Sequence, residues 1–240
     1  MVLTGHAQSI ESPNRQLNLT FHVDNGIPYY SLLYKGKIII EKSRLGFEMK
    51  NIPSMVDNFS ILKSSTSAFD ETWEPVWGEV KKIRNQYNEL EITLEQGSPK
   101  RTVIIRFRLY DDGLGFRYEF PNQKNLSYFT IAEEITQFNL GKDYTAFWIR
   151  GDYDTNEYNY TTSLLSEVSH QIDAATEEIS AQTPTKEISV QTPLMLKGNG
   201  VYINIHEAAL KDYPAMLLEL DSTGVILSTH LTPDPLGGKG

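Results

Sequence analysis

Residues 103–120 read VIIRFRLYDDGLGFRYEF, and this stretch decides the fold class. Apolar side chains alternate with arginines before the Asp-Asp-Gly sequence, and aromatic side chains alternate with charged ones after it. An alternation of period two on both sides of a glycine turn predicts two antiparallel strands joined as a hairpin. Arg106 and Arg108 then share a polar face with Arg117 and Glu119, where opposite charges can pair across the strands.

The same period continues in both directions from this hairpin. Residues 17–23 alternate and lead through Asn25-Gly26 into residues 30–40, which Lys35-Gly36 interrupts, so we expect a meander. Further short strands are expected at 90–94, 144–149, 192–196, 201–205, 216–220 and 225–227. Many short strands separated by turn signals predict an all-β fold, an antiparallel β-sandwich. The patterns at 51–66 and 162–185 are weak, and we interpret the first as loop or irregular strand and the second as a long loop with one helical turn.

Composition excludes several classes of function. The chain has 240 residues, a net charge of −9 and 40% hydrophobic residues, which is ordinary for a globular protein. The acidic balance and the lack of a Lys/Arg cluster argue against nucleic acid as a partner, and the lack of an apolar run of about 18 residues argues against a membrane span. Because there is no cysteine, disulfides, thiolate nucleophiles and Cys-ligated zinc are excluded.

The two ends of the chain differ from the middle. Gly5 and Ala7 are small residues two apart, as at the end of a secretory signal peptide, so we interpret residues 1–10 as a signal remnant or a disordered N-terminus. We expect residues 11–240 to form one β-sandwich domain. Residues 231–240 read LTPDPLGGKG, which has no strand period, and we expect the domain to be incomplete at this end.

Two clusters combine aromatic or acidic side chains. Residues 69–79 read FDETWEPVWGE, in which Trp73 and Trp77 could stack on sugar rings beside carboxylates or could be core or interface anchors. Asp152, Asp154 and Glu157 lie within six residues of one another and could supply oxygen ligands to Ca²⁺, although the spacing is not that of an EF-hand. The alternative for these acids is a solvated acidic loop.

A third candidate is the His206-Glu207 pair at the end of a predicted strand. Such a pair could act as an acid/base unit, or it could be a hydrogen-bonded structural pair. No nucleophile-elbow motif accompanies it, and the spacing of the acidic residues does not reveal a pair of glycosidase carboxylates.

Four longer segments resemble the N-terminal domain of glycoside hydrolase family 97. They are residues 72–89 (TWEPVWGEVKKIRNQYNE), 104–120 (IIRFRLYDDGLGFRYEF), 146–160 (AFWIRGDYDTNEYNY) and 202–210 (YINIHEAAL). The resemblance implies a super-sandwich of the galactose-mutarotase type that precedes a (β/α)8 catalytic barrel. This chain contains no part of that barrel, so we expect it to be non-catalytic on its own.

Within that family the chain is most similar to the calcium-dependent α-glucosidase branch, which hydrolyses starch-derived oligosaccharides with inversion. The resemblance assigns Glu157 as one ligand of Ca²⁺, with the other ligands supplied by the barrel, and leaves Asp152 and Asp154 to shape the loop. It implies an oligosaccharide substrate, the barrel as the packing partner, and a periplasmic or secreted location. The retaining α-galactosidase branch of the family, a stand-alone carbohydrate-binding module and a purely structural module remain alternatives.

Overall fold

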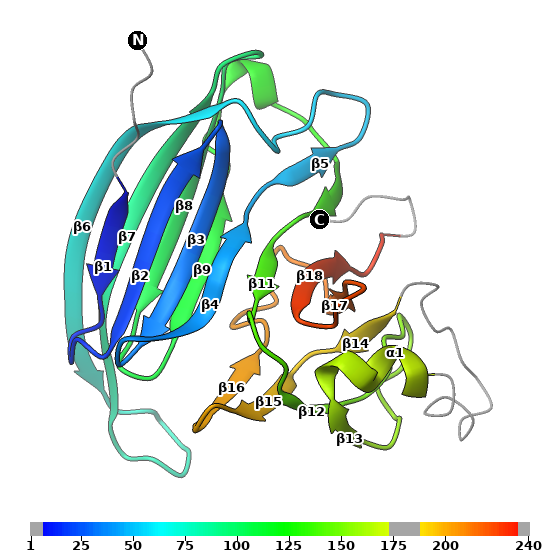
Figure 1. Cartoon of the computed structure of the whole chain (residues 1–240). Coiled ribbons are helices and arrows are strands. Elements are labelled where there is room, and N and C mark those ends of the chain that lie inside the picture. Colours follow the sequence, from blue (N-terminus) through cyan, green and yellow to red (C-terminus); the bar gives the residue numbers. More distant parts are fainter. Residues whose placement is uncertain (1–6, 173–187, 235–240) are drawn as a thin grey trace. The chain divides into compact units, whose positions relative to one another are not determined.

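The computed structural model describes residues 7–172 and 188–234, and nearly all of its regular structure consists of antiparallel strands (Figure 1). The chain divides into two compact units. The first comprises residues up to 42 together with 57–128, and the second comprises 43–56 together with the residues from 129 onward. The predicted all-β fold class is confirmed. No helix in the described ranges is long and apolar enough to cross a membrane.

The first unit contains two four-stranded sheets. One follows the order β1 (Gln8–Glu11), β2 (Leu17–Asp24), β3 (Ile27–Tyr34) and β4 (Lys37–Arg44). The other follows the order β6 (Phe59–Trp73), β7 (Ile83–Gln96), β8 (Arg101–Leu109) and β9 (Leu114–Glu119), and the short helix η1 (Lys124–Leu126) comes after it.

Local turn chemistry explains the predicted meander. Asn25 and Gly26 join β2 to β3 with φ values of 50° and 80°, and Lys35 and Gly36 join β3 to β4 with values of 50° and 74°. Two successive positive φ angles define the type I′ turn, which matches the twist of the flanking strands. The predicted meander over residues 17–40 is therefore confirmed.

The 103–120 hairpin is also present, with β8 paired to β9 in the register Phe107↔Phe116 and Ile105↔Tyr118. On its inner face the Phe107 ring lies 5.9 Å from the ring of Phe21 in β2, so the two sheets of this unit pack as layers of a sandwich. On its outer face Arg106 pairs with carboxylates, as the sequence predicts.

The second unit is built from shorter strands. β5 (Phe47–Met49) pairs with β10 (Ile131–Glu134). A second sheet follows the order β11 (Gln137–Asn139), β18 (Ile226–Leu231), β17 (Met216–Leu220) and β14 (Ser189–Gln191). A third follows the order β13 (Thr161–Leu164), β12 (Thr145–Trp148), β15 (Leu194–Gly198) and β16 (Val201–Ile205). The helical turns η2 (Leu165–Glu167) and α1 (Val168–Gln171) come after β13.

Trp148 anchors the third sheet. Its side chain is 1% exposed, and its indole N–H donates to the Ser163 hydroxyl at 3.0 Å, so the polar atom of a buried ring is satisfied. Close packing also explains Gly198, where a Cβ would lie 2.6 Å from the ring of Tyr144.

The two weakly patterned stretches have physical explanations. β6 begins at Phe59, and a register shift between Ile61 and Lys63 interrupts its alternation, so 51–66 contains an irregular strand. Strand β13 at 161–164 was not predicted, whereas the helical turn after it was. Residues 173–187, most of the predicted signal remnant and the end of the C-terminal tail lie outside the described residues.

Candidate functional site

Residues 151–160 connect β12 to β13 and are called the acidic loop here. Its start is fixed against β14, because the Gly151 N–H donates to the Ser189 carbonyl oxygen at 2.8 Å and Arg150 forms a β-bridge with Val190. A Cβ at Gly151 would collide with the Ser189 side chain. Glycine at this position therefore permits the close backbone approach that aims the loop.

Asp152 organises the first half of the acidic loop. Its side chain is buried, and Oδ1 accepts hydrogen bonds from the backbone N–H groups of Asp154 at 2.8 Å and Thr155 at 3.2 Å. Oδ2 accepts the Tyr158 hydroxyl at 2.6 Å. Burial and the neighbouring Asp152 raise the pKa of Tyr158 to about 12, so the phenol stays protonated and remains a donor at neutral pH. The predicted turn-shaping role thus fits the contacts of Asp152.

Two further contacts hold the loop from outside. The Gln191 side-chain amide donates to the Thr155 carbonyl oxygen at 2.6 Å. The Tyr153 hydroxyl lies 2.7 Å from His230 Nε2, and the two rings are stacked with centroids 5.9 Å apart. On its other side, His230 Nδ1 lies 3.6 Å from a carboxylate oxygen of Glu133. The loop is therefore tied to strands β14 and β18 of its own unit, and His230 of β18 in turn lies beside Glu133 of β10.

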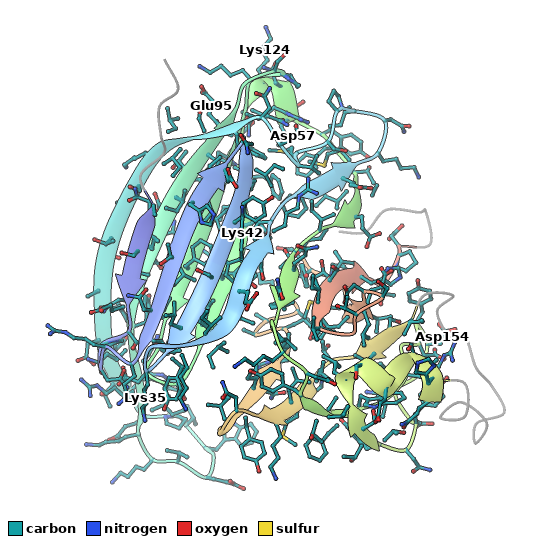
Figure 2. The ribbon with its side chains drawn as sticks, viewed as in Figure 1. Lys35, Lys42, Asp57, Glu95, Lys124 and Asp154 are labelled. Carbon is teal, nitrogen blue, oxygen red and sulfur yellow. The ribbon has the colours of Figure 1, made fainter. Side chains whose placement is uncertain are left out.

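Two carboxylates of this anchored loop face solvent. Asp154, which Figure 2 labels, and Glu157 are exposed. Within the described ranges neither carboxylate makes a hydrogen bond or ion pair. Only the backbone N–H of Glu157 is engaged, by the Thr155 hydroxyl at 3.2 Å. Glu157 therefore presents a carboxylate without a partner in the described ranges, on a loop that Asp152 shapes.

A Ca²⁺ ion needs about six to eight oxygen ligands. The described part of the chain contains no group of three His, Cys, Asp or Glu side chains placed to hold a metal. An exposed carboxylate such as Glu157 fits as one member of a calcium shell, and further acidic or histidine ligands would have to come from outside the described residues.

His206 and Glu207 do not form an acid/base pair. His206 Nδ1 lies 2.8 Å from the backbone carbonyl oxygen of Glu207. The Glu207 carboxylate instead accepts the Thr192 hydroxyl at 2.7 Å and the Met216 backbone N–H at 2.6 Å. The geometry matches the structural interpretation, in which Glu207 ties β17 to the start of β15.

Trp73 and Trp77 belong to the first unit, whereas the acidic loop belongs to the second. Trp73 ends β6 and Trp77 lies in the β6–β7 connection, with exposed fractions of 46% and 88%. Neither indole is part of a core, so the interpretation of these residues as core anchors is excluded.

An apolar hollow adjoins the end of the acidic loop. It has a volume of about 350 Å³ and is lined by Phe147, Tyr160, Pro193, Met195 and Asn204. Among these lining residues only the Asn204 amide and the Tyr160 hydroxyl are polar side-chain groups, so this surface suits an apolar side chain better than a hydroxyl-rich ligand.

Sequence reasoning identified Asp152, Asp154 and Glu157 but missed the residues that hold them. Tyr153 and His230 are 77 residues apart in the sequence, and Gln191 and Thr155 are 36 apart. Neither pair belongs to a motif of fixed spacing. The one local signal was the run of small and acidic residues at 151–155, typical of a turn closed by an aspartate side chain.

Comparisons with known proteins agree with this architecture. The sequence profile described as "Glycosyl-hydrolase 97 N-terminal" matches residues 10–233. A retaining alpha-galactosidase of Bacteroides thetaiotaomicron is 23% identical over 239 residues, which cover 95% of this chain and 32% of that protein.

Solved structures give the same result. A glycoside hydrolase family 97 enzyme from Pseudoalteromonas sp. strain K8 in complex with acarbose superimposes with a TM-score of 0.80 at 31% identity, over 96% of this chain and 33% of that one. A variant from the same organism was solved in complex with panose, with the same TM-score and identity. A beta-arabinopyranosidase at 22% identity and a TM-score of 0.75 shares the fold. The chain spans about a third of the length of these relatives.

Proposed function

Because the chain belongs to the N-terminal domain family of glycoside hydrolase family 97, we propose that it is the β-sandwich part of a calcium-dependent α-glucosidase and supplies Glu157 to the metal site of a separate catalytic barrel. The single observation that carries this proposal is the acidic loop. It is anchored at both flanks, yet it presents a carboxylate that the rest of the described chain leaves unengaged.

The chemistry of the loop supports a metal ligand more than a catalytic acid. A glycosidase carboxylate that acts as general acid can lie in an apolar pocket, whereas Glu157 is exposed on a loop. A solvent-facing carboxylate can complete the coordination of a hard cation. When bound, Ca²⁺ would supply positive charge near the scissile sugar.

The apolar hollow beside Tyr160 supports the second half of the proposal. If Glu157 shares a cation with carboxylates of a barrel, the surface next to the loop must lie against that barrel. The hollow lined by Phe147 and Met195 gives an apolar side chain of the barrel a place to pack. Loop and hollow together form a surface with one charged ligand and an apolar contact.

The α-glucosidase assignment rests on ligand chemistry. Panose is an α-linked glucose trisaccharide, and the Pseudoalteromonas enzyme structures with acarbose and panose are 31% identical to this chain. The Bacteroides retaining alpha-galactosidase, at 23% identity, makes that branch the second candidate. The proposal includes inversion of the anomeric centre and a periplasmic or secreted location.

The test uses the full-length protein of which this chain is proposed to be the N-terminal part. We expect it to hydrolyse p-nitrophenyl α-glucoside faster than the α-galactoside, to lose this activity in EDTA and to regain it with Ca²⁺. NMR should show β-glucose as the first product. Faster cleavage of the α-galactoside with release of α-galactose would replace the assignment by the retaining branch, and activity unaffected by EDTA would remove calcium from the proposal.

A further inference from the structure

The longest hairpin of the first unit extends beyond its sheet. β6 pairs with β7 from Phe59↔Gln96 to Trp73↔Ile83, whereas β8 pairs with β7 only between Asn88 and Gln96 (Figure 1). Residues 69–87 therefore form a two-stranded ribbon, called the arm here, that no third strand of the described chain supports. An isolated two-stranded ribbon is marginally stable in water, so packing of one of its faces on another surface would stabilise it.

The two faces of the arm differ in polarity. The pairs Phe69↔Tyr87 and Trp73↔Ile83 place four apolar side chains on one face, with the single polar pair Glu71↔Asn85 between them. The Phe69 and Tyr87 rings stack with centroids 5.2 Å apart. The opposite face is polar, because it carries the pair Thr72↔Arg84 and a bidentate ion pair between Asp70 and Arg84 with N–O distances of 2.9 and 2.7 Å. The arm is an amphipathic β-ribbon.

Its apolar face points away from the core of its own unit. In β7 the side chains of Leu90, Ile92 and Leu94 are at most 1% exposed and form the inner face of the sheet. Since side chains alternate with period two, Tyr87 and Ile83 lie on the opposite, outer face. The apolar side chains of β7 thus change from one face to the other between residues 87 and 90, although the β6–β7 pairing has no register shift there. Tyr87 is only 8% exposed, because Arg108 and Tyr110 of the same unit lie against its ring. The rest of this face is open, since Phe69, Trp73 and Ile83 are 39%, 46% and 37% exposed, so a surface that covers them has to come from elsewhere.

The tip of the arm extends the apolar surface. Val76, Trp77 and Val80 are 101%, 88% and 57% exposed. Clustered exposed apolar side chains mark interaction sites. Aliphatic valines beside the indoles offer no hydrogen bonds to sugar hydroxyls, so the arm suits a protein surface better than a glycan.

The charges on the arm argue against edge-to-edge strand pairing with a second copy of the chain. The β6 side of the arm carries the acidic residues Asp70, Glu71 and Glu74. The β7 side carries the basic residues Lys81, Lys82 and Arg84. Two copies related by a twofold axis would pair β6 with β6 or β7 with β7, which places like charges opposite each other. Such a dimer is disfavoured along either edge.

We propose that the arm is a docking element whose apolar face packs on another domain of the same, longer polypeptide. This proposal rests on the proposed function, because it needs the further domain that a chain spanning a third of its relatives' length implies. The occupant should present an apolar surface that accepts Trp73 and the indole of Trp77 at the tip. It should place basic groups beside the acidic strand and acidic groups beside the basic strand.

Single cysteines test this directly, because the chain has none of its own. Ile83→Cys places a thiol on the apolar face, and Thr72→Cys places one on the polar face one ladder position away. Both sites are exposed, so we expect both thiols to react with a maleimide at similar rates in the 240-residue chain. In the full-length protein, Ile83→Cys should react at least ~10-fold more slowly, while Thr72→Cys keeps its rate within about twofold, since accessibility controls thiol reactivity.

Each other outcome has a defined meaning. Equal rates at both sites in the full-length protein would overturn the docking proposal. Protection in the 240-residue chain that rises with its concentration would assign the face to a second copy and overturn it as well. Protection in a full-length protein that hydrolyses no α-glycoside would support the arm but refute the proposed function, so the two failures are distinguishable. Far-UV circular dichroism and the melting temperature of each variant control for misfolding.

Discussion

Replacing Asp152 tests whether the acidic loop is pre-shaped or merely solvated. Asp152→Ala removes the acceptor of two backbone N–H groups and of the Tyr158 hydroxyl. The two N–H groups can bond water instead, so each lost hydrogen bond lowers the stability by about 1 kcal/mol. Tyr158 is 6% exposed, so leaving its hydroxyl without an acceptor lowers the stability by about 1–3 kcal/mol. Removal of a buried charge returns part of its desolvation cost, which leaves an expected loss of about 2–4 kcal/mol.

Two matched variants isolate the carboxylate. Asp152→Asn keeps an oxygen for the two N–H groups and places an amide N–H opposite the Tyr158 hydroxyl. The hydroxyl can rotate to accept a hydrogen bond from that amide, so we expect a stability loss of about 1 kcal/mol. Asp154→Ala removes an exposed acid without a side-chain partner in the described ranges and should change stability by less than about 0.5 kcal/mol.

The assay is urea unfolding followed by tryptophan fluorescence. Trp148, the last residue of β12 and 1% exposed, reports on the strand that leads into the loop. The order of stability should be wild type and Asp154→Ala, then Asp152→Asn, then Asp152→Ala. If Asp152→Ala unfolds within about 1 kcal/mol of wild type, or if Asp154→Ala costs as much, the loop is not held by Asp152 and the reasoning fails.

Two further predictions concern buried carboxylates. Burial raises the pKa of Glu134, so the folded state keeps a proton that the unfolded state releases above the ordinary pKa, and wild-type stability falls as pH rises. Glu134→Gln can still pair with Tyr213 and does not titrate. Its stability relative to wild type should therefore increase as pH rises from about 4.5 to 7, by up to about 1.4 kcal/mol per pH unit. Burial opposes the ionisation of Glu89, but hydrogen bonds from Arg108 and Arg106 outweigh it and lower the pKa. Glu89→Gln should therefore cost about 2 kcal/mol at pH 7, a difference that shrinks as pH falls below 4 because wild-type Glu89 becomes protonated. Urea midpoints across this pH range check both, and parallel pH profiles of variant and wild type would contradict them.

The sequence predicted the parts of the fold that local chemistry determines. Asn25-Gly26 and Lys35-Gly36 place a glycine where each turn needs a positive φ, and the alternation at 103–109 leaves only one face for the core. The irregular start of β6 was not resolvable, because the register shift after Ile61 breaks the period that identifies a strand.

The candidate site shows the same limit. Aspartate chemistry indicated the role of Asp152, but the Tyr153–His230 contact joins residues from distant strands and depends on sheet order. The aromatic cluster at 69–79 was visible in the sequence, whereas its amphipathic form was not. Only the pairing register places Phe69 opposite Tyr87 and Trp73 opposite Ile83.

The most direct test of the central claim is calorimetric titration of Ca²⁺ into the full-length protein and its Glu157→Gln variant. The substitution keeps the size of the side chain and removes its charge. Because the carboxylate is exposed and has no partner among the described residues, we expect an unchanged melting temperature without the metal. The account predicts that Ca²⁺ binds the variant at least ~10-fold more weakly, with a parallel loss of α-glucoside turnover, because a hard cation loses an anionic oxygen ligand. Equal calcium affinity and turnover in the two proteins would contradict it.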